Sequence, residues 1–152
     1  MQTEKSRIQI RKAGLKDLPA VLSVYAGALN EDQSLTAAEA GRIFKRMKSY
    51  PDYHVYVAVE NRQVVGTFAL LIMDNLAKLG TPSGIVEDVA VLPEWQGRGI
   101  GKQMMRFALD VCRKAGCYKM VLSSNTRRTS AHRFYESLGF RKHGYSFRAD
   151  LD

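Results

Sequence analysis

The alternation of apolar and polar residues predicts several strands in the middle of the chain. Residues 53–60 (YHVYVAVE) and 63–73 (QVVGTFALLIM) are rich in β-branched and aromatic residues. These two runs predict a hairpin whose tight turn lies at residues 61–62. The apolar run at 85–92 predicts another strand, which Pro93 ends.

Apolar residues at three-four spacing predict four helices. The first begins at Asp17, and the second follows Thr36 and Glu39, which form a capping-box pattern. A strong amphipathic pattern predicts a helix over 99–116. A shorter pattern predicts a helix over 130–139, which ends on a glycine.

Three further strands complete the predicted order of elements. One is short and contains Ile8 and Ile10, and the others cover 117–124 and 140–151. Strand, helix and strand from 85 to 122 form a crossover unit, which makes those two strands parallel. The pattern therefore predicts an α+β fold with a mixed, mostly antiparallel sheet and helices on both faces. The length of 152 residues fits one domain, residues 1–152.

The net charge of the chain indicates which classes of partner it favours. A net charge of +8 favours an anionic partner, such as nucleic acid, an acidic membrane surface or a phosphorylated small molecule. No nucleic-acid-binding module is recognised, and Tyr53, Tyr56 and Phe68 fit a sheet core better than a base-stacking surface. No run reaches the roughly 20 apolar residues of a membrane span. We therefore expect neither nucleic acid nor membrane as a partner.

The two cysteines carry no motif. Cys112 and Cys117 lie five residues apart, without a CxxC or histidine pairing, so we expect no disulfide framework and no metal site. The N-terminal MQTEKSRIQI lacks the apolar core of a signal peptide. We therefore expect a cytoplasmic protein with reduced thiols.

A glycine-rich loop joins the strand at 85–92 to the helix at 99–116. Its sequence is Gln96-Gly97-Arg98-Gly99-Ile100-Gly101. Gln103 stands where a Walker A loop needs Ser or Thr, and the GxGxG spacing departs from the dinucleotide pattern GxGxxG. Glycines can still turn backbone N–H groups toward a phosphate at the positive end of a helix, and Arg98 and Lys102 add charge. The pattern favours a pyrophosphate site; a turn needed only for tight packing is the alternative.

Two blocks of sequence give this chain a resemblance to the GNAT superfamily of acyl-CoA-dependent N-acetyltransferases. Residues 96–101 match its signature Gln/Arg-x-x-Gly-x-Gly/Ala, placed between a strand and a helix. Residues 131–140 (AHRFYESLGF) match its FYExxGF segment. The order of elements also matches from Ile8 to Leu151.

The resemblance implies that acetyl-CoA is the co-substrate and that the parallel strand pair is splayed. The pantetheine arm would pair with one strand of that gap, loop N–H groups would hold the pyrophosphate, and an N–H near Val89 would polarise the thioester carbonyl. The cofactor-binding residues it implies are Val89, Ala90, Val91, Gln96, Gly97, Arg98, Gly99, Ile100, Gly101, Lys102 and Asn125. The common family pattern has asparagine seven residues before the tyrosine of FYExxGF, where this chain has Arg128.

The resemblance also implies two catalytic groups. Tyr135 matches the tyrosine that points at the coenzyme sulfur, and a pKa near 10 would keep it protonated as general acid. The alternative is that Tyr135 only packs. Glu87 and Asp88 interrupt an apolar strand at the mouth of the expected gap, and alternation would send them to opposite faces. We expect Glu87 to act as general base; the alternatives are an exposed carboxylate, one that only orients substrate, or His132 as base.

The acceptor is expected to be a small primary amine. Parts of the chain are similar to glucosamine-6-phosphate acetyltransferases and to aminoalkylphosphonate acetyltransferases, whose amines carry a phosphoryl or phosphonyl group. Arg128, with Arg127 and Arg133 nearby, could bind that group bidentately, unless these arginines are only solvated. We expect Glu87, Asp88 and Arg128 to contact the acceptor. A protein or peptide amine, and a non-catalytic acyl-CoA sensor, stay open. The resembled subgroups also suggest a homodimer.

Overall fold

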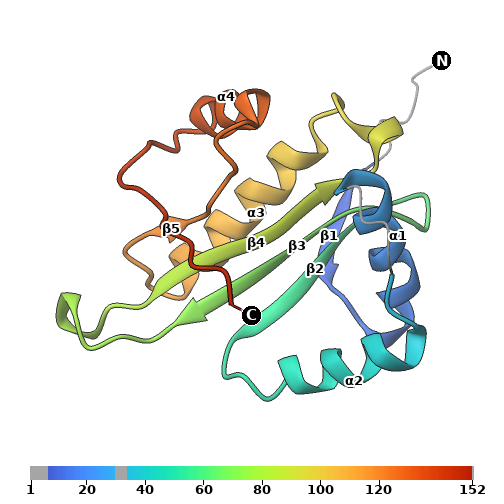
Figure 1. Ribbon diagram of the computed structural model, residues 1–152, viewed down its shortest axis with the longest axis horizontal. Coiled ribbons are helices and arrows are strands. Elements are labelled where there is room, and N and C mark those ends of the chain that lie inside the picture. Colours follow the sequence, from blue (N-terminus) through green and yellow to red (C-terminus); the bar gives the residue numbers. More distant parts are fainter. Residues whose placement is uncertain (1–6, 30–33, 152) are drawn as a thin grey trace. The chain divides into compact units, whose positions relative to one another are not determined.

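The computed structural model describes residues 7–29 and 34–151 as two compact units that divide between Val121 and Leu122. Most of the N-terminal segment considered above lies outside the described residues. The strands are β1 (Gln9–Lys12), β2 (Tyr53–Glu60), β3 (Gln63–Met73), β4 (Ser83–Val91) and β5 (Met120–Val121) (Figure 1). The helices are α1 (Leu18–Ala28), α2 (Ala37–Met47), α3 (Ile100–Lys114) and α4 (Thr129–Ser137), with 3₁₀ turns η1 (Leu15–Asp17), η2 (Lys78–Gly80) and η3 (Pro93–Trp95). No helix among the described residues has the length and apolar content of a transmembrane segment.

The five strands of the first unit form one sheet in the order β1-β2-β3-β4-β5. Neighbours from β1 to β4 are antiparallel, and β4 pairs with β5 in parallel. This confirms the mixed, mostly antiparallel sheet. The predicted turn at Asn61 and Arg62 joins β2 to β3, and both residues have the positive φ that a two-residue hairpin turn requires.

Helices cover both faces of the sheet, as predicted. On one face, α1 and α2 pack on alternate residues of β2, with Val21, Phe44, Val55 and Val57 in one buried cluster. On the other face, Phe107 of α3 meets the ring of Tyr56. Tyr56 in turn stacks on Phe68 with ring centroids 5.1 Å apart, and both are buried. These aromatic residues are sheet core, as expected.

A close approach between α3 and β4 depends on Gly84. A Cβ added at Gly84 would collide with the Cys112 sulfur of α3. Because no side chain separates them, the helix lies directly on the strand beside β5. Cys112 and Cys117 are free thiols, and burial raises the pKa of Cys112 to about 12.

The capping box predicted before α2 is present. Thr36 Oγ1 accepts a hydrogen bond from the Glu39 N–H at 3.2 Å, and Glu39 Oε2 accepts one from the Thr36 N–H at 2.8 Å. Two backbone N–H groups at the start of α2 thereby have hydrogen-bond partners in neighbouring side chains. No side chain among the described residues caps α3 in this way.

Two predicted strands differ from the structure. The strand predicted over 117–124 is reduced to β5, Met120–Val121. The final strand predicted over 140–151 is wrong, because these residues adopt no regular secondary structure. Their alternation fits a strand, but a strand also needs a partner edge for its backbone N–H and C=O groups, and these residues have none within their own unit. Tyr145 and Phe147 are 92% and 93% exposed.

Candidate active site

The parallel pair β4–β5 is joined only at its start. Gly84 lies opposite Met120, and Ile85 lies opposite Val121. Within the described residues of this unit, β4 then continues from Val86 to Val91 with no strand on that edge. Its backbone groups there are available to an extended ligand, in the way that a peptide adds to an open sheet edge.

A bulge changes the direction of β4 at its middle. Thr67 of β3 lies opposite Ala90, but Ala69 lies opposite Glu87, so Asp88 and Val89 share one partner on β3. Asp88 takes a left-handed conformation, with φ of 53°. A bulge bends the strand and re-aims its side chains. The bulge therefore interrupts the regular alternation of β4 between Glu87 and Ala90, and the opposite faces expected of Glu87 and Asp88 stay a prediction.

The chain leaves β4 through η3 and enters α3 through the glycine loop (Figure 1). Gly97 and Gly99 have φ of 76° and 81°, a region that is costly for other residues. Gln96 braces this turn, since its side-chain Nε2 donates to Val91 O at 3.0 Å and its backbone N–H donates to Pro93 O at 3.2 Å. Both hydrogen bonds stabilise the loop. A contact between Gln96 and the coenzyme stays a prediction.

Several backbone donors of this loop stay open. Among the described residues, no hydrogen bond outside helices and strands uses the N–H of Gly97, Arg98 or Gly99. The first N–H groups of α3, at Ile100 to Lys102, precede the i−4 ladder, and no described side chain caps them. A Cβ at Gly97 or Gly99 would meet no atom within 4 Å. The space beside the loop is therefore open, and the helix dipole favours an anion there.

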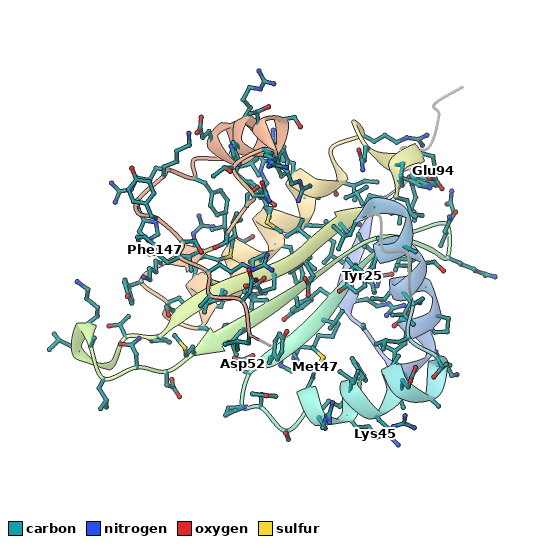
Figure 2. The ribbon with its side chains drawn as sticks, viewed as in Figure 1. Tyr25, Lys45, Met47, Asp52, Glu94 and Phe147 are labelled. Carbon is teal, nitrogen blue, oxygen red and sulfur yellow. The ribbon has the colours of Figure 1, made fainter. Side chains whose placement is uncertain are left out.

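Glu87 and Asp88 lie near two tyrosines. Both carboxylates are exposed, whereas Tyr25 of α1 (Figure 2) and Tyr53 of β2 are partly buried. The pKa of Tyr25 is raised to about 12, mainly by burial and to a smaller extent by the negative charge of Asp88. Burial raises the pKa of Tyr53 too, and Asp88 and Glu87 raise it further. Two negative charges beside two neutral phenols make a site that suits a cationic group such as a protonated amine.

Thr67 lies beneath this group of side chains. It is fully buried, and its hydroxyl donates to Tyr56 O at 2.7 Å. The hydroxyl also interacts with the phenol of Tyr25, which partly offsets the rise in the pKa of Tyr25. A buried polar residue on β3, beside the bulged part of β4, thus lies close to the phenol of Tyr25.

The second unit contains Tyr135, on α4. Its ring contacts those of Phe134 and Phe140, with centroid distances of 5.1 and 5.7 Å. Burial raises the pKa of Tyr135, and the positive charge of Arg128 offsets part of that rise. The phenol therefore stays protonated at neutral pH, as a general acid must.

Asn125 organises the turn that leads into α4. Its Oδ1 accepts from the Arg127 N–H at 2.9 Å, and its carbonyl accepts from the Arg128 N–H at 3.0 Å. His132 also contacts that carbonyl, with Nε2 at 2.8 Å, and because a carbonyl only accepts, Nε2 carries the proton. Among the described residues, the Asn125 side-chain NH₂ group makes no hydrogen bond, so it is available to a ligand.

The sequence-predicted residues fall into two groups. The structure brings the glycine loop, the open edge of β4, Glu87 and Asp88 into the first unit, and Asn125, Arg128, His132 and Tyr135 into the second. Sequence reasoning missed Tyr25, which lies in the first predicted helix, and Tyr53, which it assigned to the sheet core. It also missed Trp95, whose ring lies under Arg98. For Trp95, the only signal in the sequence was its position three residues before Arg98 of the glycine loop.

The donor chemistry at these positions suits an organic anion and an amine. Nowhere in residues 7–29 and 34–151 do three or more His, Cys, Asp or Glu side chains gather so as to hold a metal ion. Backbone amides, carboxylates and a protonated phenol are the reactive groups present. They could bind a phosphate, attract a cation and supply a proton.

Comparison with known proteins agrees with this arrangement. The sequence model of the Acetyltransferase (GNAT) family matches residues 20–140. The chain is 31% identical to a glucosamine 6-phosphate N-acetyltransferase of Trypanosoma brucei brucei, covering 95% of this chain and 96% of that protein. It is 29% identical to an aminoalkylphosphonate N-acetyltransferase of Salmonella typhimurium, covering 94% and 91%.

A solved structure shares the same fold. A putative acetyltransferase from Agrobacterium tumefaciens superposes with a TM-score of 0.89 and 36% sequence identity. The match covers 94% of this chain and 99% of that one.

Proposed function

Because the chain belongs to the GNAT acetyltransferase family and is an N-acetyltransferase, we propose that it moves an acetyl group from acetyl-CoA to a small primary amine bearing a phosphoryl or phosphonyl group. One observation carries this proposal. The open edge of β4 leads directly into a loop whose N–H groups surround the uncapped start of α3. An extended thioester arm that ends in a diphosphate fits that combination.

The first unit would hold the donor. The backbones of Val89, Ala90 and Val91 pair with the amide groups of the pantetheine arm, and the N–H groups from Gly97 to Lys102 hold the diphosphate. The bulge aims the N–H near Val89 at the thioester oxygen. A backbone donor at that point stabilises the negative charge that develops as the amine attacks.

The carboxylates would prepare the acceptor. An alkyl amine reaches the site as an ammonium ion, and it must lose a proton before it can attack. Glu87 accepts that proton, directly or through water, while Asp88 holds the ammonium in place. The neutral phenols of Tyr25 and Tyr53 line the same place without adding charge.

Tyr135 would complete the reaction as general acid. Its proton passes to the coenzyme sulfur as the carbon–sulfur bond breaks, so that a thiol leaves instead of a thiolate. The raised pKa of Tyr135 supports this role, because the phenol is fully protonated at neutral pH. We also propose that residues 1–152 act as one N-acetyltransferase domain.

The class of acceptor rests on the relatives and on charge. The names of the relatives specify amines that carry phosphate or phosphonate. The net charge of +8 suits an anionic acceptor as well as an anionic coenzyme. Arg128, at the start of α4, supplies a guanidinium that can bind a phosphoryl group bidentately.

An assay of thiol release tests the proposal. Acetyl-CoA is offered with glucosamine 6-phosphate and with aminoalkylphosphonates, each matched to the same amine without its phosphorus group. We expect release with the phosphorus-bearing amines and at least tenfold lower kcat/KM for their matched partners. Release only with peptides or diamines would contradict the acceptor class. Coenzyme binding without release for any amine would indicate a sensor.

The role of Glu87 has its own test. Glu87→Gln should lower kcat by about 100-fold, in the range typical of general-base catalysis. Asp88→Asn, the matched change next to it, should act mainly on KM because it weakens the hold on the ammonium. Equal kcat in Glu87→Gln and the unmodified protein would remove Glu87 from the reaction and return His132 to consideration.

We also propose that the protein is a cytoplasmic homodimer. Tyr145 and Phe147 are almost fully exposed at alternating positions, which suits addition to an edge of a second copy. Sedimentation of Tyr145→Ser/Phe147→Ser should show monomers where the unmodified protein shows dimers. A monomeric unmodified protein would refute the dimer without touching the activity.

A further inference from the structure

Arg98 is held against the ring of Trp95. The carbon of its guanidinium lies 4.5 Å from the indole centroid. Trp95, the last residue of η3, is partly buried, while the Arg98 side chain is exposed. Among the described residues, no carboxylate pairs with Arg98. The side chain therefore has a fixed support and an unneutralised charge.

Among the described residues, no hydrogen bond or ion pair involves the Arg98 guanidinium, so its donors are available to a ligand. A guanidinium is planar and carries its five N–H donors in the plane, so a ring against one face does not block them. A cation–π contact of this kind stabilises the stacked position by about 0.5–1 kcal/mol at an exposed site. Arg98 thus presents its donors from the η3 side of the loop, whereas the open backbone donors lie along Gly97 to Lys102.

Coenzyme A carries two separate anionic groups. The diphosphate joins the pantetheine arm to the ribose, and a phosphate monoester stands on the 3′ oxygen of that ribose. The backbone N–H groups and the dipole of α3 suffice for the diphosphate. A dianionic monoester beyond the ribose is a separate group, and a guanidinium can bind two of its oxygens at once.

We propose that Arg98, positioned by Trp95, binds the ribose 3′-phosphate and thereby makes the enzyme select coenzyme A over its 3′-dephospho form. The inference rests on the proposed function, because it assigns part of the same coenzyme. Trp95 is a positioning residue that acts through Arg98. The pair links η3 and the glycine loop into one recognition element.

Calorimetric titration with coenzyme A and with 3′-dephospho-coenzyme A tests the inference. The unmodified protein should bind coenzyme A about 10- to 100-fold more tightly, as expected for hydrogen bonds to a charged group. Arg98→Gln should reduce that preference to within about twofold and leave the dissociation constant of the dephospho form unchanged. Arg98→Lys should keep only part of the preference, because lysine lacks the planar fork.

Two further variants separate recognition from simple support of the loop. Trp95→Leu should lower the preference partly while thermal melting shows a folded protein. Arg106→Gln, which removes an exposed arginine further along α3, should keep the full preference. Arg98→Gln with an undiminished preference, or with equal weakening of both ligands, would overturn the inference alone. An unmodified protein that binds neither ligand would refute the proposed function and this inference with it.

Discussion

The β4–α3 junction and the α4 region supply different kinds of chemistry. The junction offers mainly backbone groups: an open strand edge, a bulge at Asp88 and a loop with positive φ at Gly97 and Gly99. The α4 region offers side chains: the Tyr135 phenol among aromatic rings and the Asn125 amide in a hydrogen-bonded turn.

This difference predicts how each region responds to substitution. Backbone groups are kept in every substitution except one to proline, so the glycine loop is sensitive mainly where a new side chain alters φ or blocks the ligand. A catalytic side chain can be deleted with little change of fold. Variants of the glycine loop should therefore act on coenzyme affinity, and variants of Tyr135 on α4 should act on turnover.

The largest effect is expected from Tyr135→Phe. Removal of one oxygen should lower kcat by about 100-fold or more, the range of general-acid catalysis, while the acetyl-CoA dissociation constant changes less than twofold. Steady-state kinetics and calorimetry measure the two quantities. Tyr118→Phe is the matched control, since it removes an exposed phenol that has no proposed role, and it should leave both unchanged.

The pH dependence sharpens this prediction. Burial raises the pKa of Tyr135 above its usual value near 10, so the proton is present below that pH and is lost only above it. The alkaline loss of kcat that depends on Tyr135 should therefore have its midpoint above pH 10. A fall of kcat that is centred well below pH 9 in the unmodified protein, and that is absent in Tyr135→Phe, would contradict a raised pKa of Tyr135.

A smaller effect, on affinity, is expected from Gly99→Val. A branched side chain at φ of 81° strains the loop and occupies the space beside the open N–H groups. The acetyl-CoA dissociation constant should rise about 10- to 100-fold, which corresponds to about 1.5–3 kcal/mol for hydrogen bonds to a charged group.

Gly116→Val is the matched control for that variant. Gly116 lies just beyond the other end of α3, has φ of 78°, and also has no atom within 4 Å of an added Cβ. Both variants should lose about 1–2 kcal/mol of folding stability from the same strain. Equal affinities for acetyl-CoA in the two variants would show that the loop does not hold the coenzyme.

The smallest effect is expected from Gly84→Ala, in the packed half of β4. The new methyl group would collide with Cys112, so the free energy of unfolding should fall by about 1–3 kcal/mol while coenzyme affinity is kept. Denaturant unfolding measures the change. Gly41→Ala, an open position in α2, should instead gain about 0.5–1 kcal/mol. Weaker coenzyme binding by Gly84→Ala would show that the two halves of β4 are not separate in function.

The sequence predicted the features that depend on local pattern. The hairpin turn at Asn61, the capping box at Thr36 and the glycine loop all follow from residue types at fixed spacing. The strand predicted over 140–151 failed because alternation alone does not supply a partner edge.

The bulge and its neighbours could not be predicted from one segment. The left-handed Asp88 depends on the register of β3 against β4, and its closeness to Tyr25 and Tyr53 depends on how α1 and β2 pack on the sheet. No spacing in the sequence records those contacts. The stacking of Arg98 on Trp95 depends in the same way on the path of η3.

Backbone amide chemical shifts, followed by NMR as coenzyme A is added, test the central claim most directly. If the glycine loop grips the diphosphate, the amides from Gly97 to Lys102 should show the largest shifts, followed by those of Val89, Ala90 and Val91. Saturable binding that leaves the amides of Gly97, Gly99 and Gly101 unmoved would contradict the account.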